Sequence, residues 1–168
     1  SLMISKKIAS VITSVMVFCC MVGVSLTNVK ADDSAPKSVD GSYLTSADSS
    51  TGYTPKNNER GKHLMDGQCS ISKTGTKRIY AYGSTTANHT VDAVAVIVYV
   101  DQYNEKDDEW YQIDAFSKKV ENDYYSAISK SIQVDRGYYY RVHADHFVRM
   151  GEEPIEETFS VTNGILVP

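Results

Sequence analysis

The sequence of 168 residues predicts an all-β fold: a single seven-stranded antiparallel β-sandwich that follows a signal peptide and a disordered polar spacer. Two observations predict it. From residue 66 onward, short apolar or alternating runs are separated by turn-forming residues roughly every 8 to 15 positions, a spacing typical of all-β domains. In the same region, no stretch repeats its apolar residues with the period of a helix.

Residues 1–31 have the organisation of a secretory signal peptide. Lys6 and Lys7 precede an apolar run over residues 8–26, and residues 29–31 (VKA) form an A-x-A-like cleavage site. We therefore expect cleavage after residue 31 and a secreted, extracellular product. Retention of the segment as a membrane anchor is the alternative, because an apolar run of 19 residues approaches the ~20 that span a bilayer.

The charge balance limits the partners of the secreted part. The whole chain has a formal charge of −4, and residues 1–31 hold three basic and no acidic residues, so the remainder carries −7. Such an acidic chain lacks the basic surface that nucleic acids or anionic membranes require. We therefore expect no nucleic-acid partner, and no membrane association once the signal peptide is removed.

Cysteine usage excludes an intramolecular disulfide in the secreted part. Cys19 and Cys20 lie within the signal peptide, which leaves Cys69 by itself. We expect Cys69 to be a small buried residue on a strand. An intermolecular link or a reactive thiol is the alternative.

The secreted part divides into a polar spacer over residues 32–65 and a β domain over residues 66–168. The spacer is rich in Ser, Asp, Thr, Gly, Asn and Lys, so it offers little apolar surface to bury. The strongest predicted strand is residues 91–103, in which valines alternate with residues of the other face. The seven predicted strands are 68–73, 77–84, 91–103, 110–118, 124–134, 138–150 and 157–167.

The stretch VDRGYYYRVHA, residues 134–144, resembles the start of the sixth strand of fibronectin type III domains, which are immunoglobulin-like sandwiches. Val134 takes the place of a leucine, Gly137 that of the turn glycine, and Tyr140 that of a tyrosine three residues further on. The resemblance implies a tyrosine corner, in which the buried Tyr140 bonds through its hydroxyl to the chain just upstream. Arg136 replaces the usual proline, and the second strand lacks the usual tryptophan.

The chain as a whole, with its signal, polar spacer and GYYYRVHADH core, also resembles small secreted proteins of unknown function from Gram-positive bacteria. This resemblance implies a compartment and no activity.

Alternation along the sixth strand predicts a surface strip for binding. If Tyr140 points inward, then Tyr139, Arg141 and His143 point outward, and Tyr99 of the neighbouring third strand lies beside them. Such a strip suits stacking on sugar rings or docking of a peptide. Ordinary cross-strand pairing of aromatic residues on a solvated sheet is the alternative.

Metal sites are only weakly indicated. His143 and His146 lie three residues apart and therefore face opposite sides of a strand, which excludes a shared zinc. Asp101, Asp107 and Asp108 offer oxygen ligands for calcium, but their segment lacks the central glycine of a twelve-residue calcium loop. We expect a solvated hairpin tip there, no metal and no cofactor.

No catalytic motif is present: the chain has no Gly-x-Ser-x-Gly, no His-Glu-x-x-His and no phosphate-binding glycine loop. The acid pair Glu152 and Glu156 falls in a predicted loop. We therefore predict a non-catalytic binding module for an extracellular glycan or protein, with no catalytic residues. A small secreted hydrolase with an unrecognised site is the alternative from another class.

Overall fold

The computed structural model describes residues 35–56 and 61–168, and the predicted signal peptide lies outside them. The described part is all-β, built from strands and turns without a helix. None of these residues therefore belongs to a helix long and apolar enough to span a membrane. The strands are β1 (Ser38–Val39), β2 (Ser42–Thr45), β3 (Ser49–Tyr53), β4 (Leu64–Gly75), β5 (Arg78–Asn104), β6 (Glu109–Gln133), β7 (Tyr138–Arg149), β8 (Glu156–Val161) and β9 (Gly164–Val167).

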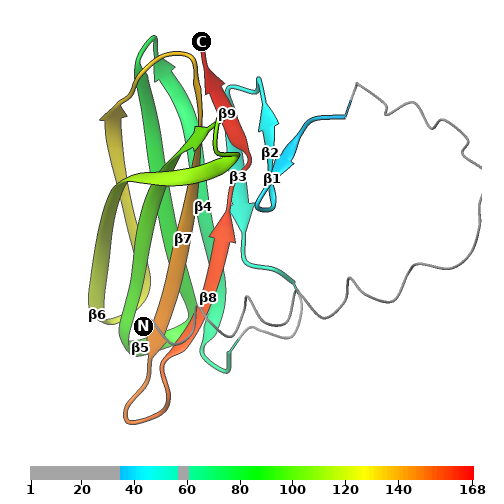
Figure 1. The fold of residues 1–168 in the computed structure, drawn as a ribbon. Coiled ribbons are helices and arrows are strands. Elements are labelled where there is room, and N and C mark those ends of the chain that lie inside the picture. The colour runs from blue at the N-terminus through cyan, green and yellow to red at the C-terminus, as the bar shows by residue number, and fades with distance from the viewer. Residues whose placement is uncertain (1–34, 57–60) are drawn as a thin grey trace, which may run out of the picture. The chain divides into compact units, whose positions relative to one another are not determined.

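The nine strands form one sheet that curls back on itself (Figure 1). Its order is β1-β2-β9-β7-β5-β4-β3, with β6 also paired to β5 and β8 also paired to β7. Among these described strands β2 and β9 run parallel, and the other pairs are antiparallel. The sheet is thus mixed and has nine strands, where the sequence predicts seven antiparallel ones.

Two pairs of predicted strands are continuous, so the additional strands come from residues 38–53 and from a break between β8 and β9. β5 contains both 77–84 and 91–103, except residue 77, and β6 contains both 110–118 and 124–134, except residue 134. The polar residues between them form bends in long strands, marked by a register shift between Thr86 and Val91. Conversely, the predicted strand 157–167 is interrupted between β8 and β9.

The bend lets the two halves of β5 face each other. The first half of β5 pairs with β4, and the second half pairs with β7. A Cβ on Gly83 would lie 2.5 Å from Val98 Cγ2, so only glycine permits this close approach. The inner surfaces of the curled sheet thereby meet and exclude water.

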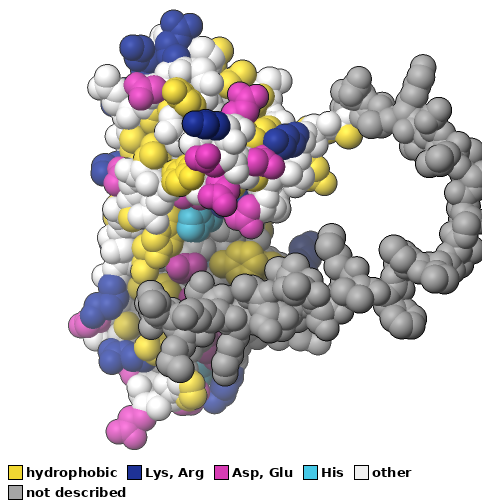
Figure 2. Space-filling model, in the orientation of Figure 1, with side chains coloured by type: hydrophobic (Ala, Val, Ile, Leu, Met, Phe, Trp, Pro, Cys, Tyr) yellow, Lys and Arg dark blue, Asp and Glu magenta, His cyan; other side chains and the backbone are white. Residues whose placement is uncertain are grey.

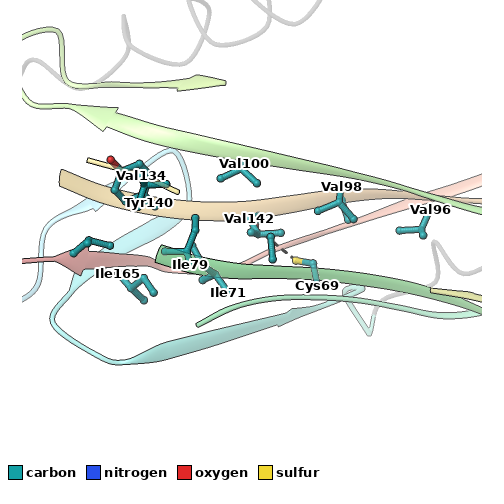
Figure 3. Packing of buried hydrophobic residues seen from close by; sticks show 13 residues of the cluster. Cys69, Ile71, Ile79, Val96, Val98, Val100, Val134, Tyr140, Val142 and Ile165 are labelled. Atoms are coloured by element: carbon teal, nitrogen blue, oxygen red, sulfur yellow. Dashed lines mark hydrogen bonds between the residues drawn. The ribbon is translucent and has the colours of Figure 1, made fainter. Parts of the chain in front are cut away.

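The main core lies between these surfaces (Figure 3). β-branched residues dominate it, as expected of strands. The Cys69 thiol points into this core with Sγ 3.6 Å from the Val142 carbonyl oxygen, so the expectation of a buried strand cysteine is confirmed. The members of this core are Cys69, Ile71, Ile79, Ala81, Val96, Val98, Val100, Val134, Tyr140, Val142, Ala144, Ile165 and Val167.

The prediction of a disordered spacer over residues 32–65 is wrong for residues 38–53, which form β1, β2 and β3. Hydrogen bonds of polar side chains replace apolar burial here. Ser42 is fully buried and donates from Oγ to the Thr162 carbonyl oxygen at 2.8 Å. Gly52 packs so closely on the Val161 backbone that a Cβ would lie 2.0 Å from its oxygen. The folded unit accordingly begins near Ala35, earlier than residue 66.

Candidate functional site

Alternate side chains of β7 lie on opposite faces of the sheet, as the sequence predicts. Tyr140, Val142 and Ala144 are buried in the core, whereas Tyr139 and His143 lie half-buried on the other face. The predicted neighbour is also present, because Tyr99 pairs with His143 across β5 and β7. Their rings stack with centroids 4.7 Å apart and planes 13° from parallel.

The sequence predicts Arg141 to be an exposed contact residue, but its relative exposure in the structure is only 6%. The turn between β1 and β2 folds over it. Its guanidinium donates to Asp101 Oδ2 at 3.0 Å and to Asp40 Oδ2 at 2.9 Å. It also lies over the Trp110 ring at 4.6 Å from the centroid. Arg141 therefore holds the N-terminal strands and is not free for a ligand.

Asp101 is the shared partner of Arg141 and His143. Burial acts to raise the pKa of this carboxyl, but hydrogen bonds from His143 and Arg141 outweigh it, so the pKa of Asp101 is lowered. His143 Nε2 lies 3.2 Å from Asp101 Oδ2. On the sheet surface, burial raises the pKa of the Tyr99 hydroxyl, with Asp145 acting in the same direction. The Tyr99 and His143 pair is therefore a small aromatic surface backed by a fixed carboxylate.

An open groove of about 870 Å³ lies between the turn that joins β5 to β6 and the start of β7. We call it the tyrosine groove. Tyr139 is the strip residue that reaches it, and Lys37 and Leu44 close it from the N-terminal strands. Its aromatic walls and neutral hydrogen-bonding groups are Tyr103, Tyr111, Tyr138, Tyr139, Gln102 and Asn104.

The rings of the groove are fixed by their neighbours. Tyr103 is 4% exposed and meets Tyr139 in an edge-to-face contact with centroids 6.3 Å apart. The Tyr103 hydroxyl donates to Asp108 Oδ1 at 2.7 Å and accepts from Lys37 Nζ at 2.9 Å. Tyr111 donates to Asp107 Oδ2 at 3.0 Å, a bond that raises the pKa of the Tyr111 hydroxyl. Three of the four groove tyrosines, Tyr103, Tyr111 and Tyr139, are thus held by contacts within the protein.

Charge in the groove is mixed, because Glu105 and Lys106 line it together with Lys37, which is paired with an acid. Lys37 Nζ lies 2.7 Å from Asp108 Oδ1. Bonds from Lys37 and then Tyr103 lower the pKa of Asp108, and the same contacts raise the pKa of Lys37. Figure 2 shows acidic side chains gathered on the upper part of the visible face, where the turn between β5 and β6 lies.

Tyr140 has the contacts expected of a tyrosine corner. Its ring is 1% exposed, and its hydroxyl donates to the Asp135 carbonyl oxygen at 2.8 Å. Gly137 turns the chain with φ at +86°, and Val134 packs in the core. Gln102 donates to the same hydroxyl from Nε2 at 3.2 Å. Burial raises the pKa of Tyr140, so the hydroxyl keeps its proton and its role is structural.

The calcium candidates point to different partners. Asp101 binds Arg141, and Asp108 binds Lys37. Asp107 Oδ2 accepts from Asn104 and from a tyrosine hydroxyl. Among the described residues, no three His, Cys, Asp or Glu side chains converge as metal ligands would.

His146 belongs to the core and not to a metal site. It is fully buried, with Nδ1 2.8 Å from Thr85 Oγ1 and Nε2 2.7 Å from Ser160 Oγ. Burial lowers its pKa to about 4, so the ring is neutral at pH 7. His143 lies on the opposite face of β7, as its spacing from His146 predicts.

No protein-family model and no curated protein matches this chain. The chemistry of the groove and of its surroundings must therefore be judged from their own residues.

A second polar cluster, absent from the sequence predictions, joins β4, β5 and the loop after β7. His63 Nε2 lies 2.8 Å from Glu153 Oε2, and His63 Nδ1 lies 2.7 Å from His89 Nε2. His89 Nδ1 lies 2.8 Å from the Thr90 carbonyl oxygen. The two outer partners, a carboxylate and a carbonyl oxygen, are acceptors, so the outer ring nitrogens donate to them.

This cluster offers no free catalytic group. All four ring nitrogens of His63 and His89 are engaged. The acid pair singled out in the sequence does not act together either, because Glu156 accepts from the backbone amides of His63 and Leu64 while Glu152 is exposed. A hydrogen bond from His63, aided by Lys62, lowers the pKa of Glu153. The sequence did not predict this cluster because its residues lie far apart in the chain.

Proposed function

We propose that the chain is a secreted, non-catalytic binding module whose tyrosine groove holds an uncharged sugar chain. One observation carries this proposal: four tyrosines and two side-chain amides line a single groove of about 870 Å³. The N-terminal signal-like sequence supports secretion.

The chemistry of the groove favours a neutral ligand. Tyrosine presents a rigid apolar ring that packs on the C–H face of a sugar at low entropy cost, with a hydroxyl at its edge. Amides both donate and accept, as sugar hydroxyls require, and Gln102 can do so beside its bond to Tyr140, whereas Asn104 is already bonded within the turn. Lys37 is already neutralised by Asp108, and the other two charged lining residues, Glu105 and Lys106, are of opposite sign, so the groove has little net charge to attract an anionic ligand.

We also propose that the curled sheet is a variant of a fibronectin type III-like sandwich. The position of Tyr140 and the contact between the two halves of β5 support this relation. β1 and β2 would then be an N-terminal addition that covers Arg141.

A glycan array tests the function, with wild-type protein beside Tyr139→Ala. Loss of one ring contact worth about 1 to 1.5 kcal/mol would weaken binding roughly tenfold. The control is Tyr43→Ala, because Tyr43 is an exposed tyrosine that does not line the groove. Absence of binding to every glycan, or binding that Tyr139→Ala leaves unchanged, would reject the groove as a sugar site and favour a protein partner.

A further inference from the structure

The outer surface of the other half of the sheet carries an unusual set of side chains. Here β3, β4, the first half of β5 and the second half of β6 lie side by side. Their registers align twelve outward residues in three rows, which we call the hydroxyl face. The rows are Ser49-Ser72-Tyr80-Ser131, Thr51-Ser70-Tyr82-Ser129 and Tyr53-Gln68-Ser84-Ala127.

The alternate residues of the same strands establish which side the rows occupy. Cys69, Ile71, Ile79 and Ala81 stand between row members along β4 and β5, and all are fully buried in the main core. Side chains alternate along a strand, so the rows lie on the side away from the core. Most row members are partly or fully exposed, Tyr53 at 60% and Tyr80 at 39%.

The composition of the hydroxyl face is distinctive. Ten of the twelve residues bear a hydroxyl, and the other two are a glutamine and an alanine. Charged residues make up 23% of the chain, so about three would be expected among twelve surface positions, yet there are none. A solvated face with no other task would normally carry charges, which also protect sheets from association.

We propose that the hydroxyl face binds the surface of an uncharged, insoluble polysaccharide. Each hydroxyl both donates and accepts, which matches the hydroxyls of a neutral sugar polymer. Neighbouring residues within a row lie about 4.8 Å apart, and neighbouring rows lie about 6.8 Å apart along the strands. This regular array suits a ligand that itself repeats. Tyr53, Tyr80 and Tyr82 add rings for stacking on sugars.

Other partners fit this face less well. Anionic polymers would require several lysines or arginines, whereas the rows contain none and one neighbouring cation, Arg78, bonds Ser131 from the edge of the first row. A second copy of the chain would require the apolar centre typical of stable protein interfaces, whereas serines occupy half of the positions here. The hydroxyl face shares no residue with the tyrosine groove, so the two surfaces can be tested separately.

The test is cosedimentation of the purified full-length chain with microcrystalline cellulose and, separately, with chitin. Tyr80→Ala removes a central ring, and the double variant Thr51→Glu with Ser129→Glu places charges at exposed positions of one row. Both should lower the bound fraction at least tenfold against one of the polymers while circular dichroism stays unchanged. Tyr43→Ala, which changes a residue of neither surface, should bind as the wild type does.

Three results would overturn the proposal. One is the absence of wild-type protein from both pellets. The second is retention that neither hydroxyl-face variant reduces, or that Tyr139→Ala abolishes by itself, since binding would then depend on the groove. The third is a dimer in sedimentation velocity that the glutamate variant dissociates, since a second copy would then occupy the face. Failure here would leave the glycan-array result for the groove unaffected.

Discussion

β7 and the N-terminal strands β1 and β2 are held in the same sheet by different forces. β7 has a fully buried apolar side, including Val142 and Ala144, and pairs with β5 over ten positions from Ala93 to Gln102. β1 and β2 pair with each other at two positions, and β2 pairs with β9 at two. Their attachment depends on polar side chains, chiefly Arg141 and Ser42.

β1 and β2 show that low apolar content does not by itself make a segment disordered. A polar strand can be ordered when a neighbouring domain supplies buried donors and acceptors that match it. Arg141 does this with its fork of N–H groups, which reaches Asp101 on β5 and the Asp40 carbonyl oxygen in the turn between β1 and β2. Four substitutions test this difference between β7 and the N-terminal strands.

Arg141→Met should have the largest effect. It leaves the Asp101 carboxylate buried without its guanidinium, and removal of one partner of a buried pair costs about 3 to 5 kcal/mol. Urea unfolding measures the loss of stability, and hydrogen exchange should show faster exchange at β2 than at β7. Equal protection of both strands would contradict the idea that Arg141 holds the N-terminal pair.

Tyr140→Ala should destabilise the apolar region by about 3 kcal/mol or more, because it removes a buried ring from the core. Tyr140→Phe is the control. It keeps the ring and loses the bond to Asp135, so it should cost only about 1 kcal/mol. Similar free energies of unfolding for the two variants would mean that the hydroxyl, rather than the packed ring, provides the stability.

His146 should make stability fall on acidification. Burial lowers its folded-state pKa to about 4, below the ordinary 6.5, so the unfolded chain takes up the proton first. Stability is therefore complete above pH 6.5 and declines by about 3 kcal/mol as the pH falls toward 4.

The measurement is urea unfolding between pH 4 and pH 8 for wild type and His146→Gln. The variant should lose this part of the slope, and an unchanged slope would assign the effect to other groups. Asp101 adds a loss in the same direction at lower pH, because its pKa is depressed and its stabilising charge disappears on protonation.

Ser42→Ala should have the smallest effect, about 1 kcal/mol for one buried hydrogen-bonding group. The informative measurement is hydrogen exchange resolved along the chain, which should become faster at β2 and stay unchanged at β7. Uniform loss of protection across both strands would show that the N-terminal strands unfold together with the core, and would remove the contrast.

The sequence predicts those elements in which apolar residues alternate. The valines of β5 and the inward set of β7 are of this kind, and so is the position of Tyr140. The pattern cannot indicate that Arg141 is covered, because its partner Asp40 is about a hundred residues away in the chain. The cluster of His63, His89 and Glu153 was missed for the same reason.

The sequence also did not predict that β5 and β6 are each one continuous strand. The polar residues between the two halves of β5 resemble a turn, yet they continue the strand through a bend. The groove could be predicted only in part. Tyr139 came from strand parity, while Tyr103 and Tyr111 are brought to it by the hairpin between β5 and β6.

The parallel pairing of β2 with β9 has a mechanical consequence. These are the second and the last strands of the folded unit, and they run in the same direction. A pull on the chain before β2 and after β9 would therefore act along both strands and load their cross-links together instead of one at a time. Those links include Ser42 to Thr162 and Thr45 to Gly164, so tension on a tethered chain would first be resisted by the polar N-terminal strands.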